Sequence, residues 1–285
     1  MLSIEEIESL LKKYKESLSD SSVATYASNI HQTIVMSTKF EKSPAGLVEF
    51  IEAKYVKPAT KKIKIMSMLT YYRASGFPEE KLARLASKFR ELFGKVEENA
   101  EMNLSSEADR GNIPNVNDIN KTLKYLEGLG DLQGLIIVHI HKLFPIRNEL
   151  ADTKIRNFKT GVDNYITHDN RTLELFKRKN GGIFKGNLQD PIPELLSRWK
   201  EQNRTDWLLL NSDGQKLSGS GLTKYLNRIF LEATGKKVGT SRIRKGFVSG
   251  ELSGQKRYAE LKENAKMMGH SVDTHLKHYR KLDVE

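Results

Sequence analysis

The chain of 285 residues contains no cysteine, and its seven histidines are scattered rather than grouped. A disulfide framework, a thiolate metal site and a cysteine nucleophile are therefore excluded. The sequence also lacks a GxxxxGK[ST] phosphate-binding loop. We therefore expect neither a metal ion nor any other cofactor.

Long hydrophobic runs are missing as well. The longest apolar stretch, residues 134–144, is interrupted by His139, His141 and Lys142 and is too short to span a bilayer. The first residues, MLSIEEIESLLKKYK, are acidic where a secretory signal would be basic. We therefore expect no membrane partner and no secretion, and a protein of the cytoplasm or the nucleus.

Positive charge is what the chain has in excess. It carries 47 Lys and Arg against 36 Asp and Glu, for a net charge of +11, with 38% hydrophobic residues. This composition is typical of a globular protein, and the charge suits a polyanionic partner such as double-stranded DNA. Solvated helix faces with surplus lysine explain the charge equally well.

The pattern along the chain predicts two domains. Apolar residues at three-to-four spacing indicate five helices within residues 1–93, begun by Ser or Pro signals such as Ser43-Pro44 and Lys57-Pro58. Asp20 or Ser21 is expected to cap the second helix, and Gly76 to close the fourth. Residues 94–115 are polar and without periodicity, which is typical of a linker.

Residues 116–285 combine helical patterns with β-prone runs. Helices are expected at about 117–128, 131–143, 191–202, 218–234, 241–253, 256–268 and 272–279. The runs KIRNF, DNYITHD and RTLELFKR and the segment WLLL are β-prone, and KNGG is a hairpin turn signal. The sequence therefore predicts a mainly α protein with a helical N-terminal domain and an α+β domain that holds a small antiparallel sheet.

The most informative segment is MMGHSVDTHLKHYRKL, near the C-terminus. It resembles the last motif of the tyrosine recombinase (phage integrase-like) family, a Gly-His-Ser turn followed nine residues after its histidine by the nucleophilic tyrosine. The resemblance assigns these roles to His270 and Tyr279. An ordinary helix with a half-buried tyrosine is the alternative.

Two arginine boxes extend the resemblance. Arg147 in LFPIRNELADTKI occupies the position of the family's first arginine, and Arg244 in TSRIRKGF that of the second. The family's second box has a histidine three residues before its arginine, where this chain has Ser241. The acid expected three residues after Arg147 is also missing, so either Glu149 or Asp152 could support that arginine.

Family members carry a lysine on a β-hairpin between the two boxes. Lys179, directly before Asn-Gly-Gly, fits this position best, and Lys177 has the same side-chain parity along the strand. Five residues are thus candidates for catalysis: Arg147, Lys179, Arg244, His270 and Tyr279.

The resemblance implies a site-specific DNA recombinase or integrase of a virus or mobile element, working in the host cytoplasm or nucleus through a 3′-phosphotyrosine intermediate. It also implies a homotetramer on two DNA sites and a helical N-terminal DNA clamp. Type IB topoisomerase-like relaxation and DNA binding without catalysis are the alternatives. For DNA contacts the basic segments predict Lys61, Lys62, Lys64, Arg242 and Lys245.

Overall fold

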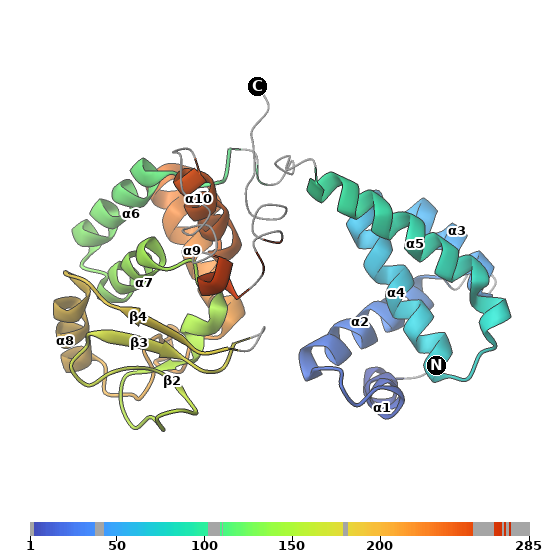
Figure 1. The fold of residues 1–285 in the computed structure, drawn as a ribbon, viewed down its shortest axis with the longest axis horizontal. Helices are drawn as coiled ribbons and strands as arrows, with labels where there is room; N and C mark the ends of the chain where they lie inside the picture. Colours follow the sequence, from blue (N-terminus) through green and yellow to red (C-terminus); the bar gives the residue numbers. More distant parts are fainter. Residues whose placement is uncertain are drawn as a thin grey trace. The chain divides into compact units, whose positions relative to one another are not determined.

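The computed structural model describes residues 3–37, 43–101, 109, 111–178, 182–252, 265–269, 271 and 274. The side chains of residues 99–101 and 248–252 are not included in that description. The chain forms two compact units, Met1–Glu101 and Met102–Glu285 (Figure 1). Each unit is treated separately below.

The first unit consists of helices in the described residues. They are α1 (Ile4–Tyr14), α2 (Asp20–Met36), α3 (Pro44–Lys54), α4 (Pro58–Ala74) and α5 (Glu79–Glu101). Proline occupies the first turn of α3 and of α4, where its missing N–H leaves no hydrogen bond unmade. Gly76 follows α4 with φ +76°, as expected for a residue that ends a helix.

Two helix ends differ from the prediction. The cap of α2 is Ser19, whose hydroxyl accepts a hydrogen bond from the Ser22 amide, rather than Asp20 or Ser21. Helix α5 continues through Gly94 to Glu101, into the segment expected to be a linker. Ion pairs from Glu91 to Lys88 and Lys95, one turn away on either side, favour this longer helix.

The core of the first unit is apolar and brings together all five helices. Its buried residues are Ile7, Leu11, Val23, Ala27, Ile30, Leu47, Val48, Phe50, Ile51, Ile65, Met68, Leu69, Tyr72, Leu82, Leu85 and Leu92. Helix α4 contacts α1, α2, α3 and α5 and is therefore central to the unit.

The second unit contains helices α6 (Val116–Leu129), α7 (Leu132–Leu143), α8 (Ile192–Gln202), α9 (Gly219–Thr234) and α10 (Thr240–Leu252). A 3₁₀ helix, η1 (Asn148–Asp152), follows α7. Asn115 and Asp118 form a capping box that starts α6, and Gly130 ends that helix in the left-handed conformation.

The sheet of the second unit is mixed, whereas the sequence predicted an antiparallel one. Its order is β1 (Thr153–Lys154), β2 (Asn164–Ile166), β3 (Thr172–Leu175) and β4 (Phe184–Asn187). Strands β2, β3 and β4 pair antiparallel, and the β3–β4 hairpin agrees with the prediction. Strand β1 pairs parallel with β2 because residues 155–163 lead the chain back, in a loop closed by the Asp163 amide on the Lys159 carbonyl.

Two β-prone runs did not become full strands. In KIRNF only Lys154 is in a strand, because the Arg156 guanidinium donates to the carbonyls of Lys200, Asn203 and Thr205 at the end of α8. The segment WLLL contributes only isolated bridges, from Trp207 and from Leu210. Side-chain anchoring and loop packing therefore override local β propensity in both places.

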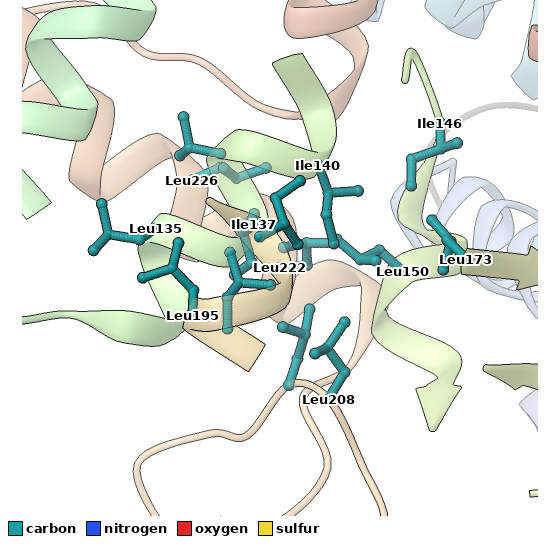
Figure 2. Packing of buried hydrophobic residues seen from close by; sticks show 14 of the residues in the cluster. Leu135, Ile137, Ile140, Ile146, Leu150, Leu173, Leu195, Leu208, Leu222 and Leu226 are labelled. Carbon is teal, nitrogen blue, oxygen red and sulfur yellow. The ribbon is translucent and has the colours of Figure 1, made fainter. Parts of the chain in front are cut away.

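The core of the second unit lies between its helices and the sheet. Figure 2 shows Ile137 and Ile140 of α7 close to Leu222 and Leu226 of α9, with Leu173 of β3 toward Ile146 and Leu150. Within the described residues no helix is both long enough and apolar enough to cross a membrane.

Candidate active site

The first arginine of the site, Arg147, lies between the end of α7 and the start of η1. Phe144 and Arg147 are extended, the Ile146 amide donates to the Phe144 carbonyl in a tight turn, and Arg147 is the N-cap residue of η1. Its side chain is partly buried, and one terminal nitrogen lies 3.5 Å from the carbonyl oxygen of Met268. The Arg147 guanidinium is thus directed at the segment that precedes His270.

The second arginine comes from α10 and is buried, with 3% of its surface exposed. Arg244 Nε donates a 2.9 Å hydrogen bond to the carbonyl oxygen of Pro145. Because Pro145 is two residues before Arg147, this bond brings together two arginine boxes that are far apart in the sequence. The structure therefore places the two predicted arginines in one region.

A second contact fixes the start of α10 to the same region. The Thr240 hydroxyl donates to Asn148 Oδ1 at 2.8 Å, and Asn148 directly follows Arg147. Gly219 at the start of α9 passes so close to Asn148 that a Cβ added there would lie 3.1 Å from the Asn148 Cβ. Ser241, at the position of the family's histidine, is exposed.

Residues 265–269 approach both the first arginine and the hairpin. Ala265 and Met268 are buried in the second unit, and Gly269 has φ +72° after the helical residues. The left-handed conformation explains why glycine precedes His270. Ser271 Oγ accepts a hydrogen bond from the Thr274 amide, as the cap of a following helix would.

The described part of the hairpin of β3 and β4 contributes Arg178 to this region. Arg178 donates from a terminal nitrogen to the Met267 carbonyl at 2.6 Å, and its guanidinium lies 5.6 Å from the centre of the Phe184 ring. Burial lowers the pKa of Arg178, the Glu149 carboxylate raises it, and the Arg147 charge lowers it. Lys177, the alternative hairpin lysine, pairs instead with Asp163 at 2.8 Å.

The structure distinguishes between the two acids that could support Arg147. Asp152 is exposed and forms an ion pair with Lys216. Glu149 is buried beside Arg178, and its Oε2 has no hydrogen-bond partner among the described residues. The buried carboxylate of the region is therefore Glu149.

A buried histidine lies near Arg244. His141 of α7 is 1% exposed, its Nδ1 is 2.9 Å from the Ile137 carbonyl, and its Nε2 has no partner in the described part of the chain. Burial lowers the pKa of His141 to about 4, opposed by the Ile137 carbonyl and assisted by the Arg244 charge. The imidazole is therefore neutral at pH 7, and its Nδ1 carries the proton because it faces a carbonyl.

Arg242 and Lys245, both predicted to bind DNA, share one buried carboxylate. Arg242 Nε lies 3.0 Å from Asp109 Oδ1, and Lys245 Nζ pairs with Asp109 Oδ2. The neighbouring Pro114 carbonyl would be 2.3 Å from a Cβ at Gly246, so this segment packs closely on α10. A phosphate would have to compete with Asp109 for both cations.

The predicted lysines of α4 have partners within the first unit. Lys64 is 4% exposed, its ammonium donates to Gln32, and burial lowers its pKa. Lys61 pairs with Glu52 at 3.2 Å, and Lys62 lies over the Phe93 ring at 5.0 Å. Contact of Lys64 with DNA stays a prediction, and its burial on the side of α4 that faces the core argues against it.

Three predicted catalytic residues lie outside the described residues: Lys179, His270 and Tyr279. Among the residues that are described, no three His, Asp or Glu side chains are grouped to hold a metal ion. Sequence reasoning missed Arg178. The contacts of Arg178, with Met267 and Glu149, join positions far apart in the sequence, so no local pattern distinguishes it from Lys177.

The fold can be compared with solved structures. A lambda integrase dimer bound to a COC′ core site matches with a TM-score of 0.60 and 13% identity over 98% of this chain and 80% of that chain. Lambda integrase bound to DNA matches with a TM-score of 0.58 and 15% identity over 98% and 95% of the two chains. A lambda integrase tetramer on a Holliday junction gives 0.57 and 14% over 93% and 77%. No protein-family model and no curated protein matches the sequence.

The fold is therefore that of the tyrosine recombinases, which confirms the structural expectation drawn from the motifs. The particular structures it matches are those of lambda integrase. At 13–15% identity this likeness concerns the fold, and the chemistry has to be argued from the residues of the chain.

Proposed function

We propose that this protein is a site-specific DNA recombinase that cleaves and rejoins DNA through Tyr279. The observation that supports this most strongly is the bond from Arg244 to the Pro145 carbonyl, two residues before Arg147. It joins the two arginine boxes on a chain with the lambda integrase fold. Three arginines and one buried carboxylate, Glu149, leave the described site with excess positive charge, which suits a phosphodiester.

In the proposed reaction the Tyr279 oxygen attacks the scissile phosphorus, and the bond from phosphorus to the 5′-oxygen breaks. Tyr279 loses its proton, and the departing 5′-oxygen takes one up. The products are a 3′-phosphotyrosine and a free 5′-hydroxyl, so the phosphodiester energy is retained for rejoining. Reversing these steps with another 5′-hydroxyl exchanges strands, and no cofactor is consumed.

Each proposed residue has a role set by its chemistry. Arg147 and Arg244 stay protonated and stabilise charge on the non-bridging oxygens, which is typically the largest catalytic contribution. His270 adds a hydrogen bond to the phosphate, and Lys179 donates the proton to the 5′-oxygen. Ser241 cannot serve as a base near neutral pH, so Tyr279 must lose its proton by another route.

Double-stranded DNA is the proposed partner, and a homotetramer on two DNA sites the proposed assembly. Solved lambda integrase structures with this fold include a protein bound to DNA and a tetramer bound to a Holliday junction. We assign DNA clamping to the helices of residues 1–93, linkage to residues 94–115 and catalysis to residues 116–285. Integration or excision of a viral or other mobile element is the biological role that fits this reaction.

A suicide substrate tests the proposal. The duplex bound most tightly in repeated selection from a random library is nicked near its centre, so that cleavage releases a short fragment and traps the covalent complex. The wild-type protein is expected to form an SDS-resistant adduct, and Tyr279→Phe to form none while binding the duplex nearly as well. An adduct with the phenylalanine variant would exclude Tyr279 as the nucleophile.

The same experiment separates the alternatives. If wild-type protein binds the duplex but never forms an adduct, the protein is a DNA-binding protein without catalysis. If it relaxes supercoiled DNA as a monomer without a paired site, it is topoisomerase-like. Exchange of strands between two copies of the selected site supports the recombinase.

A further inference from the structure

The site contains a cation that the arginine and lysine motifs do not account for. Arg178 follows β3 in the hairpin, directly after Lys177, which is held by Asp163. Its guanidinium reaches the Met267 carbonyl at 2.6 Å, across 89 positions of sequence. The described part of the hairpin is thus tied directly to residues 265–269.

The contact is part of a pair. Arg147 approaches the carbonyl of Met268 at 3.5 Å, and Arg178 binds the carbonyl of the residue before it. Consecutive carbonyls at the end of a short helical segment therefore face two guanidinium groups from different elements. Helix C-termini carry partial negative charge, so both cations are placed favourably. Two residues after Met268 comes His270.

Arg178 differs from a purely structural arginine of the same unit. The Arg156 guanidinium donates to the carbonyls of Lys200, Asn203 and Thr205, which is a satisfied arrangement. Arg178 Nε is buried and has no partner among the described residues, and Glu149 Oε2 close by is in the same condition. Native proteins rarely leave such groups unpaired, and functional sites are where they do.

The charges around Arg178 also differ from those of a simple ion pair. The like charge of Arg147 acts against Arg178, and the Glu149 carboxylate acts in its favour. Among the described residues, Glu149 is thus the carboxylate that compensates the charge of Arg178 beside Arg147. A phosphate oxygen between the arginines would relieve their repulsion without displacing Glu149.

We propose that Arg178 is a positioning residue of the site, which couples the hairpin to the turn before His270, with Glu149 as its counter-charge. This inference rests on the proposed function, because it assigns Arg178 a part in the same reaction. Through Arg178 the residues directly before Lys179 are held against residues 265–269, which directly precede His270. The scissile phosphate can then contact Lys179 and His270 without first having to order each of them separately.

The test compares Arg178→Gln with Arg171→Gln. Arg171 is an exposed arginine of the same hairpin, 3.8 Å from Asp190, and its replacement causes the same change in charge. Hydrogen exchange is measured on residues 265–269 of the DNA-free protein, together with single-turnover adduct formation and duplex affinity. Arg178→Lys is included as the conservative variant.

Arg178→Gln is expected to speed exchange in residues 265–269 and to slow adduct formation roughly 10- to 100-fold, because small misplacements are costly in transesterification. Duplex affinity should change less than about threefold, Arg171→Gln should match the wild type, and Arg178→Lys should recover part of the rate. Unchanged exchange, or faster exchange with an unchanged rate, overturns the inference. If the wild-type protein forms no adduct, the proposed function is overturned instead. The hydrogen-exchange rates then show by themselves whether Arg178 restrains residues 265–269.

Discussion

Charged side chains are used differently in residues 1–101 and in residues 102–285. In the first unit the lysines of α4 are bound by their own unit, Lys61 by Glu52 and Lys64 by Gln32. Among its described residues, the buried side-chain atoms without a hydrogen-bond partner are the Tyr55 hydroxyl and a Glu52 oxygen. That oxygen lies 3.6 Å from Lys88 Nζ.

In the second unit, buried charge gathers around one place. Arg244, Glu149 and Arg178 are buried or partly buried there, and His141 lies next to Arg244. Glu149 Oε2, Arg178 Nε and His141 Nε2 are buried without a hydrogen-bond partner among the described residues, which lowers the stability of the unit. The difference indicates that the first unit satisfies most of its buried charges itself, whereas the second keeps several buried polar atoms that its described residues do not satisfy.

The largest expected effect is that of Arg244→Gln. Removing one preorganised charge donor typically costs about 10²- to 10³-fold in rate, so adduct formation should fall by that factor. Lys95→Gln in the first unit, whose ammonium is paired with Glu91, should leave the rate unchanged. Single-turnover cleavage of the suicide duplex measures both. Equal losses in the two variants would contradict the contrast between the units.

Acid should destabilise the second unit in particular. The folded pKa of His141 is about 4, against 6.5 for the free side chain, so between these values only the unfolded chain binds the proton. Stability is therefore fully present above about pH 6.5 and falls by about 3 kcal/mol as the pH drops to about 4. Urea unfolding across this range measures the loss.

His141→Gln should remove most of that pH dependence, because glutamine does not titrate. The exposed His168 provides the control, since His168→Gln should keep the wild-type slope. If the two variants show the same pH profile, the buried imidazole is not the group responsible.

A moderate effect is expected from Asp109→Asn, which releases Arg242 and Lys245 from their shared carboxylate. Each additional phosphate contact steepens the dependence of log K on log salt by about one, so the slope should steepen by about one to two. Fluorescence anisotropy with a labelled duplex measures it. A slope equal to that of the wild type would show that these cations do not reach DNA.

The smallest effect is expected from Lys64→Met in the first unit. Its ammonium is buried, and replacing a buried cation by an apolar group of similar size is often neutral or stabilising. Thermal stability should stay within about 1 kcal/mol of the wild type or rise, and duplex affinity should not change. A clear loss of affinity would show that Lys64 reaches DNA and would remove the contrast drawn between the units.

Much of the fold was accessible from local sequence. Proline in the first turn, serine caps and glycine at helix ends act within a few residues, so α3, α4 and the end of the segment before His270 were correctly predicted. The parallel pairing of β1 with β2 was not, because it depends on how the Arg156 side chain and the loop of residues 155–163 pack. The β3–β4 hairpin was predicted because its two strands are close in sequence.

By itself, the sequence determined the order of the helices, the excess of positive charge and the two arginine boxes that pointed to the tyrosine recombinase fold. Only the tertiary structure decided that Arg244 binds the Pro145 carbonyl, that Lys64 faces the core of the first unit and that Arg178 joins the hairpin to residues 265–269. The physical reason is the distance along the sequence over which each interaction acts. Helix signals act over a single turn, whereas these contacts join positions far apart, and burial and charge pairing are properties of the folded chain.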